Sequence, residues 1–338
     1  MADKELSKKL YQKIADSTVS AASIIDRERS LIHVSPAIDF MLGGGIQSGS
    51  LVIIRGKYKA GKTTTCLHFA KKAQEQGYRI VYLNIEARLT KRDLESIPGL
   101  DLSSEKFEVI QSNDASNPLT GEEFVAIGLL KLQEYEKCVV YFDSFSQLLS
   151  EDNTMGDITE RTRDSMPLTL SKFCKRALPI LNITDNICIG ITHDIANTGP
   201  GHATKAETSG NKIQYANSFK LWAKYATGWE EEVEGMGSKK EKVQIGQYIH
   251  WECENSALGP PGLAMPGRLR YGIGIDDMAE WFDLAQGNYT GVITRKGAWY
   301  SFGEDFKAMG ELNFINKMWE NPEVAKAIIE EVKARLGS

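Results

Sequence analysis

The sequence contains no long apolar stretch. None of its apolar runs approaches the roughly 18 residues that a membrane-spanning helix requires. The first residues, MADKELSKKLYQKIADS, are charged and have the pattern of a helix, without the apolar region of a secretory signal. We therefore expect neither a membrane-spanning nor a secreted protein.

Cysteine is scarce and positive charge is not in excess. The 338 residues include five widely spaced cysteines, an odd number with no CxxC pair, which is typical of reduced core residues in a cytoplasmic protein. Lysine and arginine number 40 against 45 acidic residues, for a net charge of -5. Because the field of the whole chain repels phosphate, any surface that binds nucleic acid must be local.

Four apolar segments alternate with helical patterns along the chain. They are LVIIR (51–55), YRIVYLNIE (78–86), KCVVYFDS (137–144) and ICIGITHDI (187–195). Such an alternation indicates an α/β fold with a mainly parallel central sheet. We also expect an N-terminal helix with a Ser/Ala-rich linker, and a helix that ends at Pro179. Paired strands with a charged turn at 230–242 should follow, and then a small C-terminal domain of helix, short strand and helix.

The segment RGKYKAGKTTT (55–65) follows a strand and opens a helical pattern, which is the setting of a phosphate-binding loop. Backbone N–H groups and the helix N-terminus would bind the phosphates of ATP, Lys62 would reach the β- and γ-phosphates, and Thr63 would hold Mg²⁺. The alternative is a glycine-rich turn with an exposed lysine. The predicted ATP-binding residues of this loop are Gly56, Lys57, Tyr58, Lys59, Ala60, Gly61, Lys62, Thr63 and Thr64.

Three further polar residues end apolar strands. Asp143 stands where a water-mediated Mg²⁺ ligand is required, although it could instead cap the next helix. Glu86 could orient or deprotonate the attacking water, and a surface role fits its spacing equally well. His193 could sense the γ-phosphate, or it could be structural. Our candidate catalytic residues are Lys62, Glu86 and His193.

Longer motifs resemble those of the RecA-type homologous recombinases. The most specific are RYGIGIDDMAEWFDLA, VITRKGAWYSF and NPEVAKAIIEEVKARL near the C-terminus. VSPAIDFMLGGGIQSGSLVIIRG, VYLNIEARL, VVYFDSFSQLL and ETSGNKIQYANSFKL also match the family pattern, and VYLNIEARL places Glu86 at the family's water-activating glutamate. The likeness covers nearly all of residues 30–336 and suggests a phage-borne or otherwise divergent branch. It implies a polymerisation segment (1–33), a RecA-like ATPase core (34–270) and a small α+β C-terminal domain (271–338).

The resemblance implies an ATP-dependent recombinase that forms helical filaments on single-stranded DNA and exchanges strands with duplex DNA. The implied setting is the cytoplasm of a bacterial cell or a phage-infected host, with single-strand-binding and mediator proteins as further partners. In the family ATP lies between neighbouring subunits, and the N-terminal helix packs on the next subunit. The interface residues implied here are Leu6, Leu10, Ile14 and Tyr215.

Two polar segments, 151–165 and 196–211, correspond to the DNA-binding loops of the family. Arginine and lysine side chains would contact phosphates there, and glycines would allow the backbone to approach the strand. The alternative for both segments is a surface linker. The implied DNA-binding residues are Arg161, Arg163, Met166, Lys205, Ser209, Gly210 and Asn211.

The chain departs from the bacterial pattern at four places. Lys57, Tyr58 and Lys59 replace a proline, an acid and small residues, and the added charge is expected to tighten phosphate contacts. His193 replaces a glutamine that senses the γ-phosphate. No acidic tail follows ARLGS, so we expect less restrained DNA binding. Finally, Glu254 and Ser256 replace two lysines that reach across the subunit interface.

An acid facing ATP phosphates is repelled unless a cation lies between them. We therefore hypothesise that Glu254 belongs to the ATP site of a neighbouring subunit and binds K⁺ or a second divalent ion there.

Two other functions fit parts of the sequence. A ring-forming helicase or translocase would use the same ATP chemistry, but KGAWYSF is not typical of that class. A regulatory module that binds DNA and keeps ATP as a structural ligand would not require Glu86 and Asp143.

Overall fold

The computed structural model describes residues 2–157, 159, 164–195, 206–207, 213, 216–234 and 240–337. The chain forms two compact units, Met1–Ser30 and Leu31–Ser338. The first contains helices α1 (Ala2–Ser17) and α2 (Ala21–Ile25). Ser20 caps α2 by accepting the N–H of Ser23 at 3.0 Å, so part of the expected linker is helical.

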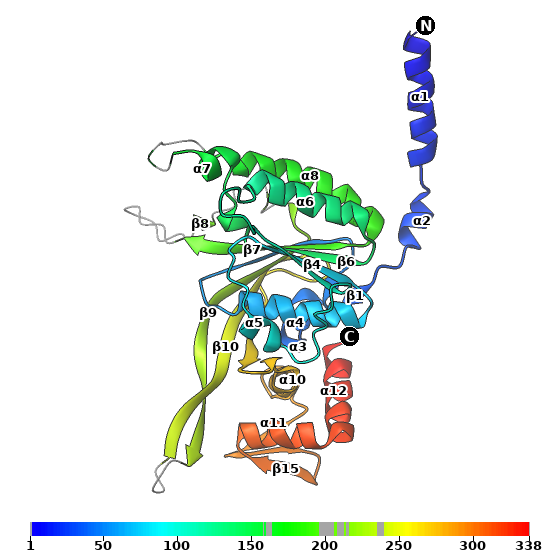
Figure 1. The fold of residues 1–338 in the computed structure, drawn as a ribbon. Helices are drawn as coiled ribbons and strands as arrows, with labels where there is room; N and C mark the ends of the chain where they lie inside the picture. The colour runs from blue at the N-terminus through cyan, green and yellow to red at the C-terminus, as the bar shows by residue number, and fades with distance from the viewer. Residues whose placement is uncertain are drawn as a thin grey trace, which may run out of the picture. The chain divides into compact units, whose positions relative to one another are not determined.

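The second unit is built on a large sheet, which has ten strands in the described part of the chain (Figure 1). Six neighbouring strands are parallel and run in the order β9, β3, β7, β6, β4 and β5. Four are short, namely β3 (Leu51–Gly56), β4 (Arg79–Asn84), β5 (Phe107–Ile110) and β6 (Cys138–Asp143). The other two are longer, namely β7 (Ile187–Ile195) and β9 (Phe219–Glu234). The expected α/β fold with a mainly parallel sheet is confirmed.

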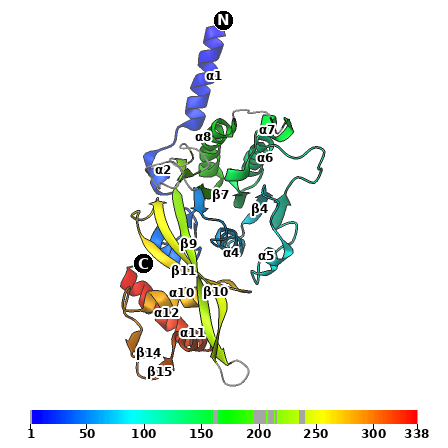
Figure 2. The same ribbon diagram turned by 90° about the vertical axis from the view of Figure 1, so that its left-hand side faces the viewer.

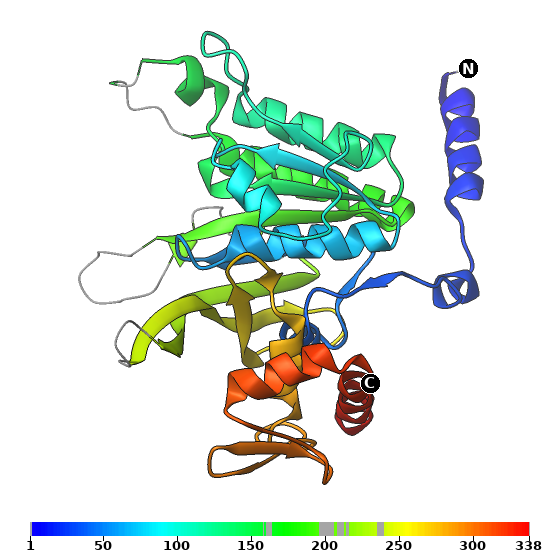
Figure 3. The same ribbon diagram turned by 60° about the horizontal axis from the view of Figure 1, so that its bottom comes forward.

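Helices cover both faces of the parallel strands. Helices α6 (Gly121–Glu134) and α8 (Met166–Thr184) lie over one face, and α4 (Lys62–Glu75) lies over the other (Figures 1 and 3). Helix α3 (Pro36–Leu42) packs on the antiparallel strands that extend the sheet. Successive residues of β3 point to opposite faces, so Leu51 and Ile53 join one buried apolar cluster while Val52 and Ile54 join the other. Burial on both faces explains why these strands are continuous apolar runs.

Antiparallel strands extend the sheet beyond β9. They are β10 (Lys240–Ser256), β11 (Ala264–Arg270) and β12 (Gly274–Ile275), and β8 (Ala206–Glu207) pairs with β7. Strands β9 and β10 form a long ribbon that extends to the side of the sheet where α11 lies (Figure 2). The expected charged turn at 230–242 is wrong in part, because β9 continues to Glu234 and β10 already begins at Lys240.

The C-terminal part packs on the same apolar cluster as α3 and α4. It contains α10 (Asp277–Ala285), α11 (Glu311–Glu320) and α12 (Pro322–Leu336). It has three short strands where we expected one, namely β13 (Thr294–Lys296), β14 (Trp299–Phe302) and β15 (Phe306–Met309). The remaining elements are β1 (Leu31–Ile32), β2 (Ile46–Gln47), α5 (Lys91–Glu95), the 3₁₀ turn Phe145–Gln147 and α7 (Glu151–Met155).

The expected end of a helix at Pro179 is wrong. Helix α8 continues to Thr184 with Pro179 inside it. Proline removes one helical hydrogen bond at a cost of about 3 kcal/mol. Burial of Leu181, two residues further on and fully inaccessible to solvent, offsets much of that cost.

Among the described residues, none of the helices combines the length and the apolarity required to cross a bilayer.

Candidate functional site

The predicted phosphate-binding loop joins β3 to α4. Gly56 has φ +154°, and a Cβ atom there would lie 2.4 Å from the carbonyl oxygen of Ala223 on β9. Gly61 has φ +77° and is the N-cap residue of α4. Both positions therefore require glycine, which fixes the path of the loop against the sheet.

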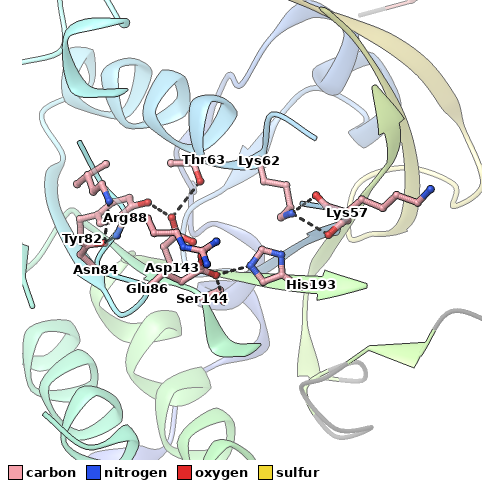
Figure 4. Close-up of polar contacts among 12 residues, drawn as sticks. Lys57, Lys62, Thr63, Tyr82, Asn84, Glu86, Arg88, Asp143, Ser144 and His193 are labelled. Atoms are coloured by element: carbon pink, nitrogen blue, oxygen red, sulfur yellow. Dashed lines mark hydrogen bonds and ion pairs between the residues drawn. The ribbon is translucent and has the colours of Figure 1, made fainter. Parts of the chain in front are cut away.

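Lys62 is buried at the start of α4. Its Nζ donates to the carbonyl oxygens of Gly56 at 2.9 Å and Lys57 at 2.7 Å (Figure 4). Burial lowers the pKa of Lys62, while the acids Asp143, Asp194 and Glu86 act in the opposite direction. The lysine side chain therefore crosses the loop, and the negative charges of these three acids stabilise its protonated form.

Asp143 lies at the C-terminal end of β6, beside the loop. Its Oδ2 accepts hydrogen bonds from the Thr63 hydroxyl at 3.2 Å and from the Tyr82 hydroxyl. Burial raises the pKa of Asp143, and these two hydrogen bonds act against that rise. A threonine hydroxyl and a carboxylate are oxygen ligands of the kind that Mg²⁺ prefers, and Mg²⁺ is usually held by few protein ligands beside a nucleotide. Thr63 and Asp143 therefore fit a magnesium site.

Glu86 lies two residues beyond the end of β4, on a turn that is tied to Asp143. The N–H groups of Ile85 and Glu86 donate to the carbonyl oxygen of Asp143 at 2.9 and 3.0 Å. Asn84 supports the same turn, since its Oδ1 accepts the N–H groups of Arg88 at 3.2 Å and Leu89 at 3.4 Å. The backbone thus fixes Glu86 beside Asp143.

Among the described residues, three side chains contact the Glu86 carboxylate. His193 Nε2 lies 2.5 Å from Oε1, the Ser144 hydroxyl donates to Oε1 at 2.8 Å, and the Arg88 guanidinium lies 3.4 Å from Oε2 (Figure 4). The hydrogen bond with His193 is the largest of the effects that hold the pKa of Glu86 below its ordinary value. Glu86 is therefore ionised near neutral pH and can accept a proton.

These groups border one pocket of about 580 Å³, a size suited to a small-molecule ligand. The loop residues Tyr58 to Thr64 lie along it with Glu86, Asp143 and His193. Its outer part is formed by residues of α5 and by the segment from Leu269 to Gly274. The structure therefore brings the predicted phosphate, metal and water-activating residues together. Gly56 and Lys57, the first two predicted loop residues, do not line the pocket.

Glu254 does not line this pocket. On β10 its carboxylate lies 3.3 Å from the Arg55 guanidinium and 3.0 Å from Lys220 Nζ. Arg55 also lies 3.7 Å from Asp194 and stacks on Trp222 at 4.1 Å, and the Trp222 indole N–H donates to Asp194 at 2.9 Å. Protein cations thus already neutralise Glu254. Ser256 instead donates its hydroxyl to the carbonyl oxygen of Leu42 at 2.6 Å.

Most of the predicted DNA-binding residues lie outside the described residues. Met166 is described, and its side chain is buried in the core at the start of α8, so its contact with DNA stays a prediction that requires this side chain to become exposed. Leu6, Leu10 and Ile14 lie on α1, where the side chains of Leu10 and Ile14 are exposed. The predicted DNA-binding and interface residues that the structure does not describe are Arg161, Arg163, Lys205, Ser209, Gly210, Asn211 and Tyr215.

Sequence reasoning missed Tyr82, Asn84, Ser144 and Arg88. Tyr82 carried a usable signal, because the hydroxyl of a tyrosine inside a strand buried on both faces requires a partner. Asn84 is a buried amide at a strand end, and the same argument applies to it.

Comparison with known proteins extends the motif evidence to most of the chain. A family model described as RecA C-terminal domain matches residues 280–337, and one described as KaiC matches residues 34–108. Protein RecA of Oleidesulfovibrio alaskensis is 24% identical over 327 residues, which cover 94% of this chain and 87% of that protein. Protein RecA of Synechocystis sp. is 25% identical over 300 residues, with coverages of 88% and 79%. Protein RecA of Gloeothece citriformis is 24% identical over 342 residues, with coverages of 99% and 91%.

Proposed function

We propose that this chain, a RecA-type protein with an ATPase core, is an ATP-dependent DNA recombinase. It would form helical filaments on single-stranded DNA, pair them with homologous duplex DNA and exchange strands, with ATP hydrolysis stimulated by DNA. The observation that carries the proposal is the assembly of Lys62, Thr63, Asp143 and Glu86 around one pocket. That pocket belongs to a chain that is similar to RecA proteins over most of its length.

The chemistry assigned to the chain's own residues follows from this geometry. Lys62 would exchange its backbone partners for the β- and γ-phosphates of ATP, and the loop N–H groups would bind the remaining phosphate oxygens. Thr63 and Asp143 would hold Mg²⁺, which supplies neutralisation of the phosphate charge. Glu86, ionised and fixed by its turn, would orient the attacking water and accept its proton.

The parts of the proposal outside this pocket follow from the family alone. They are polymerisation through Leu6, Leu10, Ile14 and Tyr215, and DNA contact through the segments 151–165 and 196–211. The three-part division at residues 33 and 270, a phage-borne or divergent origin, a cytoplasmic location and partner proteins are proposed on the same ground. K⁺ at Glu254 stays a prediction, and such an ion would compete with Arg55 and Lys220.

The decisive experiment measures ATPase activity with and without single-stranded DNA, with Lys62→Ala as the control. The proposal predicts stimulation by DNA in the wild type and loss of activity in the variant. Electron microscopy with DNA and a non-hydrolysable ATP analogue should show helical filaments. Closed rings would favour a helicase or translocase, and ATP binding without turnover would favour a regulatory module.

A further inference from the structure

Tyr82 stands behind the proposed metal site, on strand β4, which lies between β6 and the edge strand β5. It is fully buried, and its hydroxyl donates to Oδ2 of Asp143, the same oxygen that accepts from Thr63 (Figure 4). Two hydroxyl donors therefore meet at one carboxylate oxygen.

The register of the sheet explains this contact. Strands β4 and β6 are parallel, with Tyr82 beside Tyr141 and Asn84 beside Asp143. A tyrosine side chain is long enough to reach the diagonal neighbour, two residues further along the adjacent strand. Asp143 is that neighbour.

The ring of Tyr82 is held in place on both sides. It stacks on Phe107 with 6.1 Å between ring centroids and on Tyr141 with 5.7 Å. Because the ring is fully buried between these aromatic side chains, its hydroxyl is a fixed donor.

We propose that Tyr82 is a positioning residue for the metal: its hydroxyl orients the Asp143 carboxylate toward Mg²⁺ bound with ATP. This inference rests on the proposed function. Groups that hydrogen-bond a ligating carboxylate fix its orientation, and their removal typically lowers metal affinity by about 10- to 100-fold. Tyr82 does not touch the nucleotide in this scheme, since it acts through Asp143.

A purely structural role is the alternative, because a buried hydroxyl requires an acceptor in any case. The chain contains a matched control for that alternative. Tyr141 is the register partner of Tyr82 and is equally buried, but its hydroxyl donates to the carbonyl oxygen of Cys66 on α4 at 3.0 Å. Tyr82→Phe and Tyr141→Phe each remove one buried, hydrogen-bonded hydroxyl from stacked tyrosines.

The test titrates Mg²⁺ against binding of a fluorescent ATP analogue to the full chain, followed by anisotropy. We expect Tyr82→Phe to raise the Mg²⁺ concentration for half-maximal binding about tenfold, and Tyr141→Phe to change it less than twofold. Binding of the analogue in EDTA should be equal for wild type and Tyr82→Phe, since no metal is positioned there. Melting temperatures of the two variants should agree within a few degrees.

A double-mutant cycle tests whether the effect passes through Asp143. In an Asp143→Asn background, adding Tyr82→Phe should leave the Mg²⁺ dependence unchanged. Equal Mg²⁺ dependence of the two tyrosine variants, or an additive effect in the Asp143→Asn background, would overturn the inference alone. Absence of Mg²⁺-dependent binding in the wild type would overturn the inference together with the proposed function.

Discussion

His193 Nε2 lies 2.5 Å from Oε1 of Glu86, although His193 is on β7, Glu86 is on the turn after β4, and the two are 107 residues apart in the sequence. Strand β7 pairs with β3 on one side, where His193 stands beside Gly56 at the start of the predicted phosphate-binding loop, and with β6 on the other, whose last residue Asp143 holds the turn of Glu86. Strand β7 then leads directly into the predicted DNA-binding segment 196–211. The contact therefore joins the proposed water-activating acid to the strand that precedes that segment.

His193→Ala should reduce the coupling between DNA and ATP hydrolysis. We expect the ratio of ATPase rates with and without single-stranded DNA to fall about tenfold, because Glu86 loses its contact with β7. His193→Gln retains an N–H donor and should keep most of the stimulation. Equal stimulation in the wild type and His193→Ala would show that the contact is only structural.

Glu86→Gln should abolish turnover without abolishing binding. The amide cannot accept a proton from water, so kcat should fall by about 10²- to 10⁴-fold. Binding of the ATP analogue should stay within about twofold of the wild type, because Glu86 contacts His193, Ser144 and Arg88 rather than the loop. Steady-state kinetics and a binding titration on the same preparation check both expectations. Retained turnover would remove Glu86 from the mechanism.

Glu254→Gln should destabilise the chain. It leaves Lys220 and Arg55, both largely buried, without this carboxylate, and we expect a loss of about 1–3 kcal/mol in the free energy of unfolding. The control is Glu252→Gln on the same strand. Its partner Lys224 is more exposed, so we expect a loss below about 1 kcal/mol. Denaturant unfolding measures both losses, and equal values would contradict the assigned difference in burial.

Glu280 should make stability depend on pH. Its carboxyl is fully buried on α10, accepts the N–H groups of Ala37 at 2.8 Å and Arg268 at 2.9 Å, and burial raises its pKa to about 8. The folded chain therefore binds more protons than the unfolded chain between pH 4.5, the ordinary pKa, and about 8. The stabilising contribution is complete below that window and is lost as the pH rises through it.

We therefore expect wild-type stability to fall relative to Glu280→Gln between pH 5 and pH 8, by at most about 1.4 kcal/mol per pH unit. Urea unfolding of both proteins at several pH values gives the difference. A constant difference across this range would contradict the raised pKa.

Local patterns in the sequence were sufficient to predict four of the six parallel strands, β3, β4, β6 and β7, and the glycine-rich loop between β3 and α4. The apolar run 51–55 precedes glycines at the loop positions that require them, and Asp143 follows another apolar run at the expected edge of the sheet. The continuation of α8 through Pro179 was not predictable, because burial of Leu181 overrides the local preference of proline.

Contacts that depend on the register between strands could not be predicted from the sequence either. The hydroxyl of Tyr82 meets Asp143 only because β4 and β6 pair with Tyr82 beside Tyr141, which no local pattern specifies. The pairing of Glu254 with Arg55 and Lys220 likewise requires three strands to lie in a particular order.

Asp143 serves both halves of the pocket through different atoms: its side chain meets Thr63, and its main-chain oxygen receives the turn that carries Glu86. A slip of β6 against β4 would displace the proposed magnesium ligand and the proposed proton acceptor together. The proposed metal site and the proposed water-activating site therefore share one structural support, the C-terminal end of β6.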